Sequence, residues 1–510
     1  MCVQICFLLV DGHKILSYYM QYTLIWRVHP MSDKARTRFA PSPTGYMHIG
    51  NLRTALYEYL LVKKLGGDFI LRIEDTDQER YVEGACDVIY KTLKETGLNW
   101  DEGPDVGGDY GPYIQSERRD IYKKYAEQLC ESGNAYYCFC TEERLAQVRE
   151  AAGGIAKYDG HCRDIPLDEA RARAAAGEPF VIRQKMPKEG KTSFDDAVFG
   201  TITVENEELE DQILLKSDGL PTYNFANVID DHLMNITHVV RGSEYLSSTP
   251  KYNLLYEAFG WDKPIYVHCS PIMKDAQNKL SKRNGDASYQ DLVAKGYLTE
   301  AIMNYIALLG WCPKGEREIF TLPELVEAFD ISGISKSPAI YDPEKMRWVN
   351  AEYIRAMSVE QFHEVALPFI RQAVKSETAD TMLIAQCLHQ RTEVLSEIPD
   401  QLGFIDTLAD YSTDFFINKK SKSNLETSKQ MLEVSIAALE KLDSWNTDTI
   451  HDCLIDLAAS LEVKNGLLMW PVRIAASGCL VTPGGAVEVL GILGREESLR
   501  RLRLGLEKLS

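Results

Sequence analysis

The sequence predicts an α/β domain with a parallel sheet, interrupted by an insertion and followed by an all-α region. Three observations support this prediction. A strand, helix, strand, helix order runs from Thr37 to about Asp105, an apolar strand-like pattern returns near Asp211, and from Asp342 onward Leu and Ala recur at three- and four-residue spacing. Two strands joined through a helix imply a right-handed crossover and parallel pairing. The last spacing is that of helices.

The elements of the first region follow in chain order. The segment "TRFA" and the apolar segment "FILRIED" predict strands, and the ranges Asn51–Lys64 and Tyr81–Thr96 predict helices. Between about Val106 and Ser217 charged helices, "ERRDIYKKYAEQL" and "TEERLAQVREAA", mix with short strands, "PFVIRQKM" and "GTITVEN". We interpret this stretch as the insertion.

The sheet-like pattern resumes in "DQILLKSDGLPTYNFANVIDD" and "ITHVVRG". We therefore expect a domain whose two halves flank the insertion. The expected division of the chain is 31–105 for the first half, 106–217 for the insertion, 218–341 for the second half and 342–510 for the helical region.

Composition narrows the class of protein. At 510 residues and 45% hydrophobic the chain is long enough for several domains, and its net charge of -19 argues against broad, non-specific attraction to nucleic acid. Any RNA partner would have to meet local basic patches. No apolar run approaches the roughly 20 residues of a membrane helix, and twelve mostly scattered cysteines fit a reducing compartment. We expect a cytoplasmic protein.

The amino-terminal segment lacks the features of a targeting signal. Cys2–Val10 is apolar but has no basic flank and no small-residue cleavage site. A periodic, motif-bearing sequence begins only near Met31. We expect residues 1–30 to be an over-extended start.

A histidine and a glycine, His48 and Gly50 of "HIG", stand between the first expected strand and its helix. A helix that begins just after a parallel strand offers free backbone N–H groups and a positive dipole end, which together attract phosphate. Gly50 has no side chain to obstruct a flat base, and His48 can donate to phosphate oxygens. The alternative is a turn and helix cap with an incidental histidine.

A second basic motif, "KLSKR" (Lys279–Arg283), lies about 230 residues further on, in a polar stretch that predicts a loop. Two lysines, Lys279 and Lys282, suit a transition state in which negative charge builds on a departing pyrophosphate. The alternative is a solvated basic loop. The order of the two motifs, with a split sheet between them, favours nucleotide chemistry.

Several segments together resemble the bacterial-type glutamyl-tRNA synthetases, which are class I aminoacyl-tRNA synthetases. They are "RFAPSPTGYMHIGNLRTAL", "LRIEDTDQER", "WDEGPDVGG", "GPYIQSER", "SDGLPTYNFANVIDDHLMNITHVVRGSEYLSSTP", "KLSKR" and "GYLTEAIMNYIALLGW". The resemblance covers about residues 36 to 510. It implies a class I, Rossmann-type catalytic domain with an inserted domain for the tRNA acceptor end, a region around "KLSKR" that contacts the tRNA stem, and a helical anticodon-binding region.

The resemblance also implies the reaction. The α-carboxylate of L-glutamate attacks the α-phosphorus of ATP, and the glutamyl group then passes to the 3' end of tRNA(Glu). His48, Lys279 and Lys282 are the implied catalytic residues, with Mg2+, and activation is expected to need bound tRNA. The implied ATP-binding residues are His48, Gly50, Lys279, Ser281 and Lys282. We expect a monomer.

Glutamate carries two carboxylates and one ammonium group, so its site requires cationic and anionic side chains. Arg38, Arg241 and Tyr223 fall where the family grips the side-chain carboxylate, and a guanidinium gives bidentate geometry that lysine lacks. Glu74, in "RIED", falls where the family binds the ammonium group. Ser42 and Asn227 lie on matching segments of the polar lining. For any single arginine, a surface salt bridge is the alternative.

Three cysteines stand apart from the others. Cys138 and Cys140, followed by Cys162, offer three thiolates to a tetrahedral zinc. The fourth ligand stays open, with Tyr158, Asp164 and His161 all near Cys162, and Tyr158 and Asp164 are our candidates. Some members of the resembled family hold zinc at this place and others lack the cysteines. The alternative is a set of reduced, free thiols.

The helical final third favours glutamate over glutamine as the amino acid, because the related glutaminyl enzymes carry β-barrels there. Arg391 lies near the position where the family contacts the third anticodon base. Alternatives are an enzyme that also charges tRNA(Gln), a truncated paralogue that modifies an anticodon base, a small-molecule nucleotidylyltransferase and a non-catalytic RNA-binding module. The last three do not account for both phosphate motifs together with a long helical region.

Overall fold

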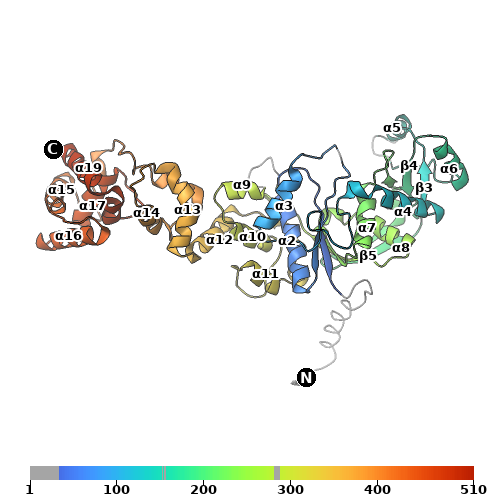
Figure 1. Ribbon diagram of the computed structural model, residues 1–510, viewed down its shortest axis with the longest axis horizontal. Helices are drawn as coiled ribbons and strands as arrows, with labels where there is room; N and C mark the ends of the chain where they lie inside the picture. The colour runs from blue at the N-terminus through green and yellow to red at the C-terminus, as the bar shows by residue number, and fades with distance from the viewer. Residues whose placement is uncertain (1–33, 78, 152, 154–156, 281–287) are drawn as a thin grey trace, which may run out of the picture. The chain divides into compact units, whose positions relative to one another are not determined.

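The computed structural model describes residues 34–77, 79–151, 153, 157–280 and 288–510 (Figure 1). The expected over-extended start and two predicted site residues, Ser281 and Lys282, lie outside these residues. The chain forms two compact units. The first ends at Tyr289 and resumes over Ile306–Tyr341, and the second consists of Gln290–Tyr305 and Asp342–Ser510.

Parallel strands form the centre of the first unit. Strand β1 (Arg36–Phe39) pairs in parallel with β2 (Asp68–Leu71), and helix α2 (Ile49–Lys64) connects them. Strand β8 (His238–Gly242) pairs in parallel with β9 (Ile265–Cys269) through α8 (Thr249–Phe259). A backbone hydrogen bond of 3.0 Å from Thr237 to Arg36 joins the two pairs. The prediction of a parallel α/β domain is confirmed.

Helix α2 is buried around most of its circumference. Leu52, Leu56 and Leu60 are fully buried, and the helix packs on β1, β2 and β8. Helix α3 (Ala85–Glu95) begins four residues later than the expected Tyr81, because Gly84 has a left-handed φ of 78° at its start.

The sheet continues into the range expected for the insertion. Strand β5 (Lys191–Asp196) is antiparallel to β6 (Gly200–Glu205) and parallel to β9, so that the order is β6-β5-β9-β8. The catalytic sheet is therefore mixed, with a parallel centre.

A separate antiparallel sheet, in the order β3-β4-β7, forms the rest of the expected insertion. Its strands are β3 (Ala135–Cys138), β4 (Val181–Gln184) and β7 (Ile213–Leu215), and its helices are α4 (Arg119–Glu131), α5 (Glu142–Ala151) and α6 (Leu167–Ala175). Tyr122, Leu129 and Leu214 are fully buried in one hydrophobic cluster with residues of α7 (Tyr223–Leu233).

One strand-like expectation is wrong. Of the segment from Asp211 to Asp231, only β7 is a strand, and Tyr223–Leu233 forms helix α7. Seven consecutive residues of this helix, from Phe225 to Asp231, are buried. Over such a short, largely buried run, helix and strand are difficult to distinguish from the sequence.

Shorter elements complete the chain up to Tyr341. They are β10 (Ile272–Met273), α9 (Tyr289–Ala294), α10 (Thr299–Leu308), α11 (Leu322–Ala328) and β11 (Ala339–Ile340).

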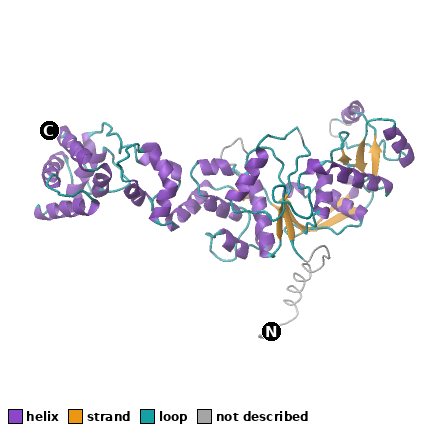
Figure 2. Cartoon of the chain, in the orientation of Figure 1, coloured by secondary structure: helices purple, strands orange, loops and turns teal. Residues whose placement is uncertain are grey.

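The region from Asp342 onward consists of helices joined by loops, as predicted (Figure 2). The helices are α12 (Pro343–Ala356), α13 (Val359–Ala373), α14 (Thr381–Leu388), α15 (Leu425–Leu439), α16 (Thr447–Ser460), α17 (Asn465–Ser477), α18 (Ala486–Leu493) and α19 (Arg495–Lys508). Side-chain capping boxes at Ser358, Asn424 and Asn446 satisfy backbone groups where α13, α15 and α16 begin.

Within the described part of the chain, no helix combines the length and the apolar character needed to cross a membrane.

Candidate active site

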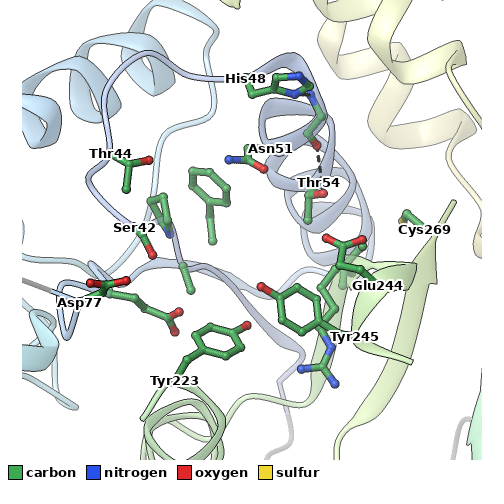
Figure 3. A pocket seen from close by; sticks show the side chains of 18 of the residues that line it. Ser42, Thr44, His48, Asn51, Thr54, Asp77, Tyr223, Glu244, Tyr245 and Cys269 are labelled. Atoms are coloured by element: carbon green, nitrogen blue, oxygen red, sulfur yellow. Dashed lines mark hydrogen bonds between the residues drawn. The ribbon is translucent and has the colours of Figure 1, made fainter. Parts of the chain in front are cut away.

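A cavity of about 1050 Å³ opens at the carboxyl ends of β1, β8 and β9 (Figure 3). Open parallel sheets bind their ligands at this edge. The cavity is at the upper end of the roughly 300–1,000 Å³ that single small ligands occupy, so it has room for more than one substrate group. Its lining includes these predicted residues: Arg38, Ser42, His48, Gly50, Glu74, Tyr223, Arg241 and Lys279.

Asn227 is the one predicted pocket residue in the described chain that does not line this cavity. It lies on α7 and is only 2% exposed. Its side chain interacts with Tyr252. Because its apolar neighbours bury the helix, Asn227 is placed behind the lining.

One end of the cavity, which we call the histidine end, consists of His48, Gly50 and Lys279. His48 caps α2 by accepting a hydrogen bond from the Gly50 backbone N–H at Nδ1, over 3.0 Å. Since Nδ1 accepts, the proton is on Nε2, which donates to the Leu280 carbonyl over 3.2 Å. The two motifs, separated by about 230 residues, therefore touch each other.

Backbone contacts hold the residues around the histidine end. Lys279 is exposed, and its backbone forms a bridge with Met273. Figure 3 shows His48, Asn51 and Thr54 on the first turns of α2, where Thr54 Oγ1 donates to the Gly50 carbonyl over 3.1 Å. A Cβ on Gly50 would lie 3.1 Å from His48 Nδ1, so this position has little room for a side chain.

The other end, which we call the arginine end, consists of Arg38, Glu74, Tyr223 and Arg241. Here the charged side chains are buried and hydrogen-bonded to other side chains. Arg38 donates from Nε to Asp231 over 2.9 Å and from Nη1 to Glu58 over 3.0 Å. Arg72 joins the same network, with 2.8 Å to Asp231 and 2.9 Å to Glu74.

Asp231 is the centre of this network. Its side chain is 4% exposed and accepts from both Arg38 and Arg72. Burial alone would raise the pKa of Asp231, but the two guanidiniums outweigh it and lower the pKa. The carboxylate therefore stays charged and fixes both arginines.

One carboxylate oxygen of Glu74 is unpaired among the described residues. Its Oε1 accepts from Arg72 and from Gln115, while Oε2 is buried and, among the described residues, has no hydrogen-bond partner. Burial raises the pKa of Glu74, and the Arg72 and Arg38 charges oppose that rise. An unpaired carboxylate oxygen in a cavity wall is suited to accept from a ligand cation.

Arg241 is held from two sides. Its Nε donates to His268 over 3.2 Å and its Nη2 donates to Thr249 over 2.9 Å. The guanidinium carbon lies 4.6 Å from the centre of the Tyr252 ring. Figure 3 shows Tyr223 and Tyr245 facing each other across this end, with ring centres 5.3 Å apart.

Sequence reasoning missed the residues that hold the arginine end. They are Glu58, Arg72, Asp231, Thr249 and His268. One signal was available, since "NVIDDHL" places two acids in an apolar run, and buried acids require a cation. The partners of those acids lie far away in sequence.

The three predicted cysteines lie together, next to β3. The sulfur atoms of Cys138, Cys140 and Cys162 all lie within 4.8 Å of one another, and those of Cys140 and Cys162 are 3.6 Å apart. A tetrahedral zinc with Zn–S bonds of about 2.3 Å requires sulfur atoms about 3.8 Å apart. The thiol spacing fits such an ion.

The two candidates for a fourth ligand differ in position. The Tyr158 hydroxyl lies 3.2 Å from the sulfur of Cys138 and 3.4 Å from that of Cys140. Asp164 has a side chain that is 89% exposed and pairs with Lys185 over 3.5 Å. The geometry therefore favours Tyr158.

Arg391 lies in the second unit, just after α14. Its side chain is exposed, and Nη1 donates to the Thr482 carbonyl over 3.4 Å. The guanidinium is available to a partner on that surface.

Comparison with known proteins gives matches over both units. Residues 34–348 match the family described as tRNA synthetases class I (E and Q), catalytic domain, and residues 361–506 match the family described as anticodon binding domain. The glutamate–tRNA ligase of Clostridium botulinum strain Hall is 60% identical over 482 residues, which cover 94% of this chain and 99% of the relative. That of Clostridium tetani is 59% identical over 480 residues, covering 94% and 98%.

Solved structures agree with these relatives. The crystal structure of a glutamate tRNA ligase from Elizabethkingia meningosepticum, in complex with its amino acid, has a TM-score of 0.85 and 36% identity. The match covers 94% of this chain and all of that one. A glutamate-tRNA synthetase from Elizabethkingia anophelis has a TM-score of 0.83 and 36% identity, over 93% of this chain and 100% of that one.

The parallel sheet, the cavity at its carboxyl edge and the helical region define a class I tRNA synthetase with an anticodon-binding domain. Within this class, the identity of about 60% over nearly the full length is decisive. The chain belongs to the glutamate–tRNA ligase family.

Proposed function

We propose that this chain activates glutamate with ATP and transfers the glutamyl group to the 3' end of tRNA(Glu). The observation that carries the proposal is that one cavity joins the histidine end to the arginine end, in a member of the glutamate–tRNA ligase family. The relatives carry the name glutamate–tRNA ligase, which gives no support to the alternative of an enzyme that also charges tRNA(Gln).

The arginine end suits glutamate because of the charges that it offers. Arg38 and Arg241, with Tyr223, would bind the side-chain carboxylate. The unpaired oxygen of Glu74 would accept from the substrate ammonium. Ser42 lines the same cavity. Asn227 lies behind the lining and would support it through its contact with Tyr252.

The histidine end suits a triphosphate. The α-carboxylate of glutamate attacks the α-phosphorus, the bond to the bridging oxygen of pyrophosphate breaks, and no protein nucleophile is needed. His48, Gly50 and Lys279, with Ser281 and Lys282, would bind ATP and stabilise the charge that moves onto pyrophosphate. His48 would have to exchange its contact with the Leu280 carbonyl for a phosphate oxygen.

Mg2+ is the expected companion of the triphosphate. The carboxylates of the cavity lining include those of Asp77, Glu79 and Glu244, which are hard oxygen ligands of the kind that Mg2+ prefers. When bound, the ion would neutralise phosphate charge.

The RNA contacts, the oligomeric state and the location stay predictions. We expect the sheet β3-β4-β7 with its helices to bind the tRNA acceptor end, and Arg391 to contact the anticodon. We also expect a monomer in the cytoplasm.

Zinc would have a structural role next to β3. Cys138, Cys140, Cys162 and Tyr158 are the proposed ligands, and the thiol spacing supports them. Metal analysis of the purified protein tests this: we expect one zinc per chain, and its loss in Cys140→Ser. Protein that contains no zinc when purified would leave the cluster as free thiols.

Aminoacylation of purified tRNA(Glu) and tRNA(Gln), with ATP and labelled glutamate at a stated salt concentration, tests the function. We expect label on tRNA(Glu) alone. Label on both tRNAs would indicate the relaxed enzyme, and label on neither would refute the proposal. In single-turnover reactions with tRNA present, Lys282→Ala should slow adenylate formation far more than it weakens glutamate binding.

A further inference from the structure

Behind Arg241 lies a buried chain of hydrogen bonds that the reaction as described does not use. Arg241 on β8 and His268 on β9 are direct neighbours in the parallel pairing of the two strands. His268 is fully buried, and its Nε2 is the acceptor for Arg241 Nε over 3.2 Å. An imidazole thus holds the inner edge of the guanidinium.

Asp196, the last residue of β5, holds the other side of the imidazole. Its Oδ2 is 2.6 Å from His268 Nδ1 and also accepts from the His268 backbone N–H over 3.1 Å. Its Oδ1 accepts from the backbone N–H groups of Val198 and Phe199, over 2.9 Å and 2.8 Å. Four hydrogen bonds therefore fix this carboxylate, and neither its side chain nor that of His268 is exposed.

The directions of these bonds settle the tautomer. A guanidinium only donates, so His268 Nε2 must present its lone pair, and the single proton is on Nδ1, facing Asp196. Thr249 Oγ1 donates to the Tyr245 carbonyl over 2.9 Å and accepts from Arg241 Nη2 over 2.9 Å. Arg241 Nη1 has no hydrogen-bond partner among the described residues, although Arg241 lines the cavity.

If His268 were protonated, its Nε2–H would face the Nε–H of Arg241, and neither group could accept a hydrogen bond. Burial lowers the pKa of His268, and the neighbouring Arg241 charge adds to that effect. Asp196 and, more weakly, Glu244 oppose it. Tyr266 and Phe194 provide the remaining aromatic neighbours, with ring centres 6.2 Å and 6.5 Å from the imidazole. The environment keeps the imidazole neutral.

We propose that Asp196 and His268 are positioning residues, which fix the Arg241 guanidinium in the orientation that selects a carboxylate over an amide. This inference rests on the proposed function, in which Arg241 binds the glutamate side chain. A guanidinium held along one edge presents only donors to the ligand. A glutamine side chain, which presents an NH2 group in place of one oxygen, then meets donor against donor.

The main variant is His268→Phe, which keeps an aromatic ring and removes both nitrogens, and His268→Gln restores an acceptor and a donor. Steady-state aminoacylation of tRNA(Glu) gives the KM for glutamate and for ATP, and the ratio of kcat/KM between glutamate and glutamine. For His268→Phe we expect the KM for glutamate to rise about 10- to 100-fold, while the KM for ATP stays within about 2-fold of the wild-type value. The ratio of kcat/KM for glutamate to that for glutamine should fall. His268→Gln should recover most of the loss.

The matched control is His238→Phe, a buried histidine on β8 that bonds to Thr237 instead of to Arg241. Its glutamate KM should equal that of the wild type. A glutamate KM that stays unchanged in folded His268→Phe would overturn the inference. So would parallel rises in both KM values that His268→Gln does not reverse, because they would indicate a general structural role.

Two further measurements keep the test decisive. If His268→Phe does not fold, Thr249→Val removes the second contact of Arg241, and it should raise the glutamate KM alone. An unchanged value there would again overturn the inference. The wild-type reaction separates the two levels of the argument: if wild type does not charge tRNA(Glu), the proposed function itself fails.

Discussion

The two ends of the cavity hold their polar groups in different ways. At the arginine end, Arg38 and Arg241 are at most 5% exposed, and each is fixed by two or more hydrogen bonds to other side chains. At the histidine end, Lys279 is exposed, and the imidazole of His48 bonds to the backbone of Gly50 and of Leu280. The first end is organised before a ligand arrives, whereas the second is organised mainly by the start of a helix.

The difference follows from the ligands that each end suits. A small amino acid must lose its water to be recognised, and its charges then require fixed counter-charges in a low dielectric. A triphosphate remains partly solvated, so backbone N–H groups and solvent-exposed lysine side chains suffice. The comparison predicts that substitutions at the arginine end lower the stability of the fold and weaken the binding of glutamate. Substitutions at the histidine end should instead weaken the use of ATP.

The largest effect is expected from Asp231→Asn, which leaves Arg38 and Arg72 without their shared carboxylate. We expect the first unit to lose about 3 kcal/mol of unfolding free energy at pH 7, measured by urea unfolding. The control is Asp195→Asn on β5, whose exposed carboxylate accepts from Thr201; it should change the unfolding free energy by less than about 0.5 kcal/mol.

The pH dependence of this difference has a definite sign. The folded-state pKa of Asp231 is lowered, so its contribution is present above the unfolded-state pKa of about 3.9 and is lost as pH falls through the lower, folded-state pKa. The gap between wild type and Asp231→Asn should therefore persist from pH 7 to pH 5 and narrow only below about pH 4. A gap that narrows between pH 7 and pH 5 would contradict this assignment.

Arg241→Ala should produce the next largest effect, and this effect should be confined to kcat/KM for glutamate. The variant removes a buried guanidinium that faces the cavity, so kcat/KM for glutamate should fall about 100-fold in aminoacylation assays. Arg317→Ala removes an arginine that pairs with Glu324 and is 56% exposed, and it should leave the value unchanged. If the KM for ATP rose equally in Arg241→Ala, the two ends would not be separate sites.

Lys279→Ala tests the histidine end of the cavity. Lys279 is exposed, so water screens part of its charge, and we expect about a 10-fold lower rate of adenylate formation with the KM for glutamate unchanged. Lys274→Ala is the matched control, because Lys274 is an exposed lysine five positions earlier that does not line the cavity. Equal losses in the two variants would mean that general charge, and not position, is responsible.

The sequence predicted the residues that face the ligand better than those that hold them. Arg38, His48, Glu74 and Arg241 were found because each lies in a short motif whose pattern is local. Asp231 and His268 were missed, because their role depends on partners about 190 and 70 residues away, Arg38 and Asp196. Local patterns carry no information on such pairs.

The fold shows the same limit. The parallel strands were predictable from short apolar runs, because both of their faces are buried. The helical final third was predictable from the three- and four-residue spacing of its apolar residues. Helix α7 was not, because helix and strand are difficult to distinguish over so short a buried run. Asn227 was expected in the lining because it lies on a segment that matches the family, but its orientation depends on that helix, which places it behind the lining.

Gly50→Ala is expected to give the smallest effect, and it tests whether the histidine end depends on close approach. Alanine suits a helix better than glycine does, so the substitution alone favours stability. Its Cβ would meet His48 Nδ1 at 3.1 Å, so the imidazole must shift by a few tenths of an ångström. We expect these effects to cancel within about 0.5 kcal/mol in urea unfolding, while the KM for ATP rises about 3-fold. Gly403→Ala, which meets nothing within 4 Å, is the control for kinetics. An unchanged KM for ATP would mean that the missing side chain at position 50 serves the helix cap and not the nucleotide.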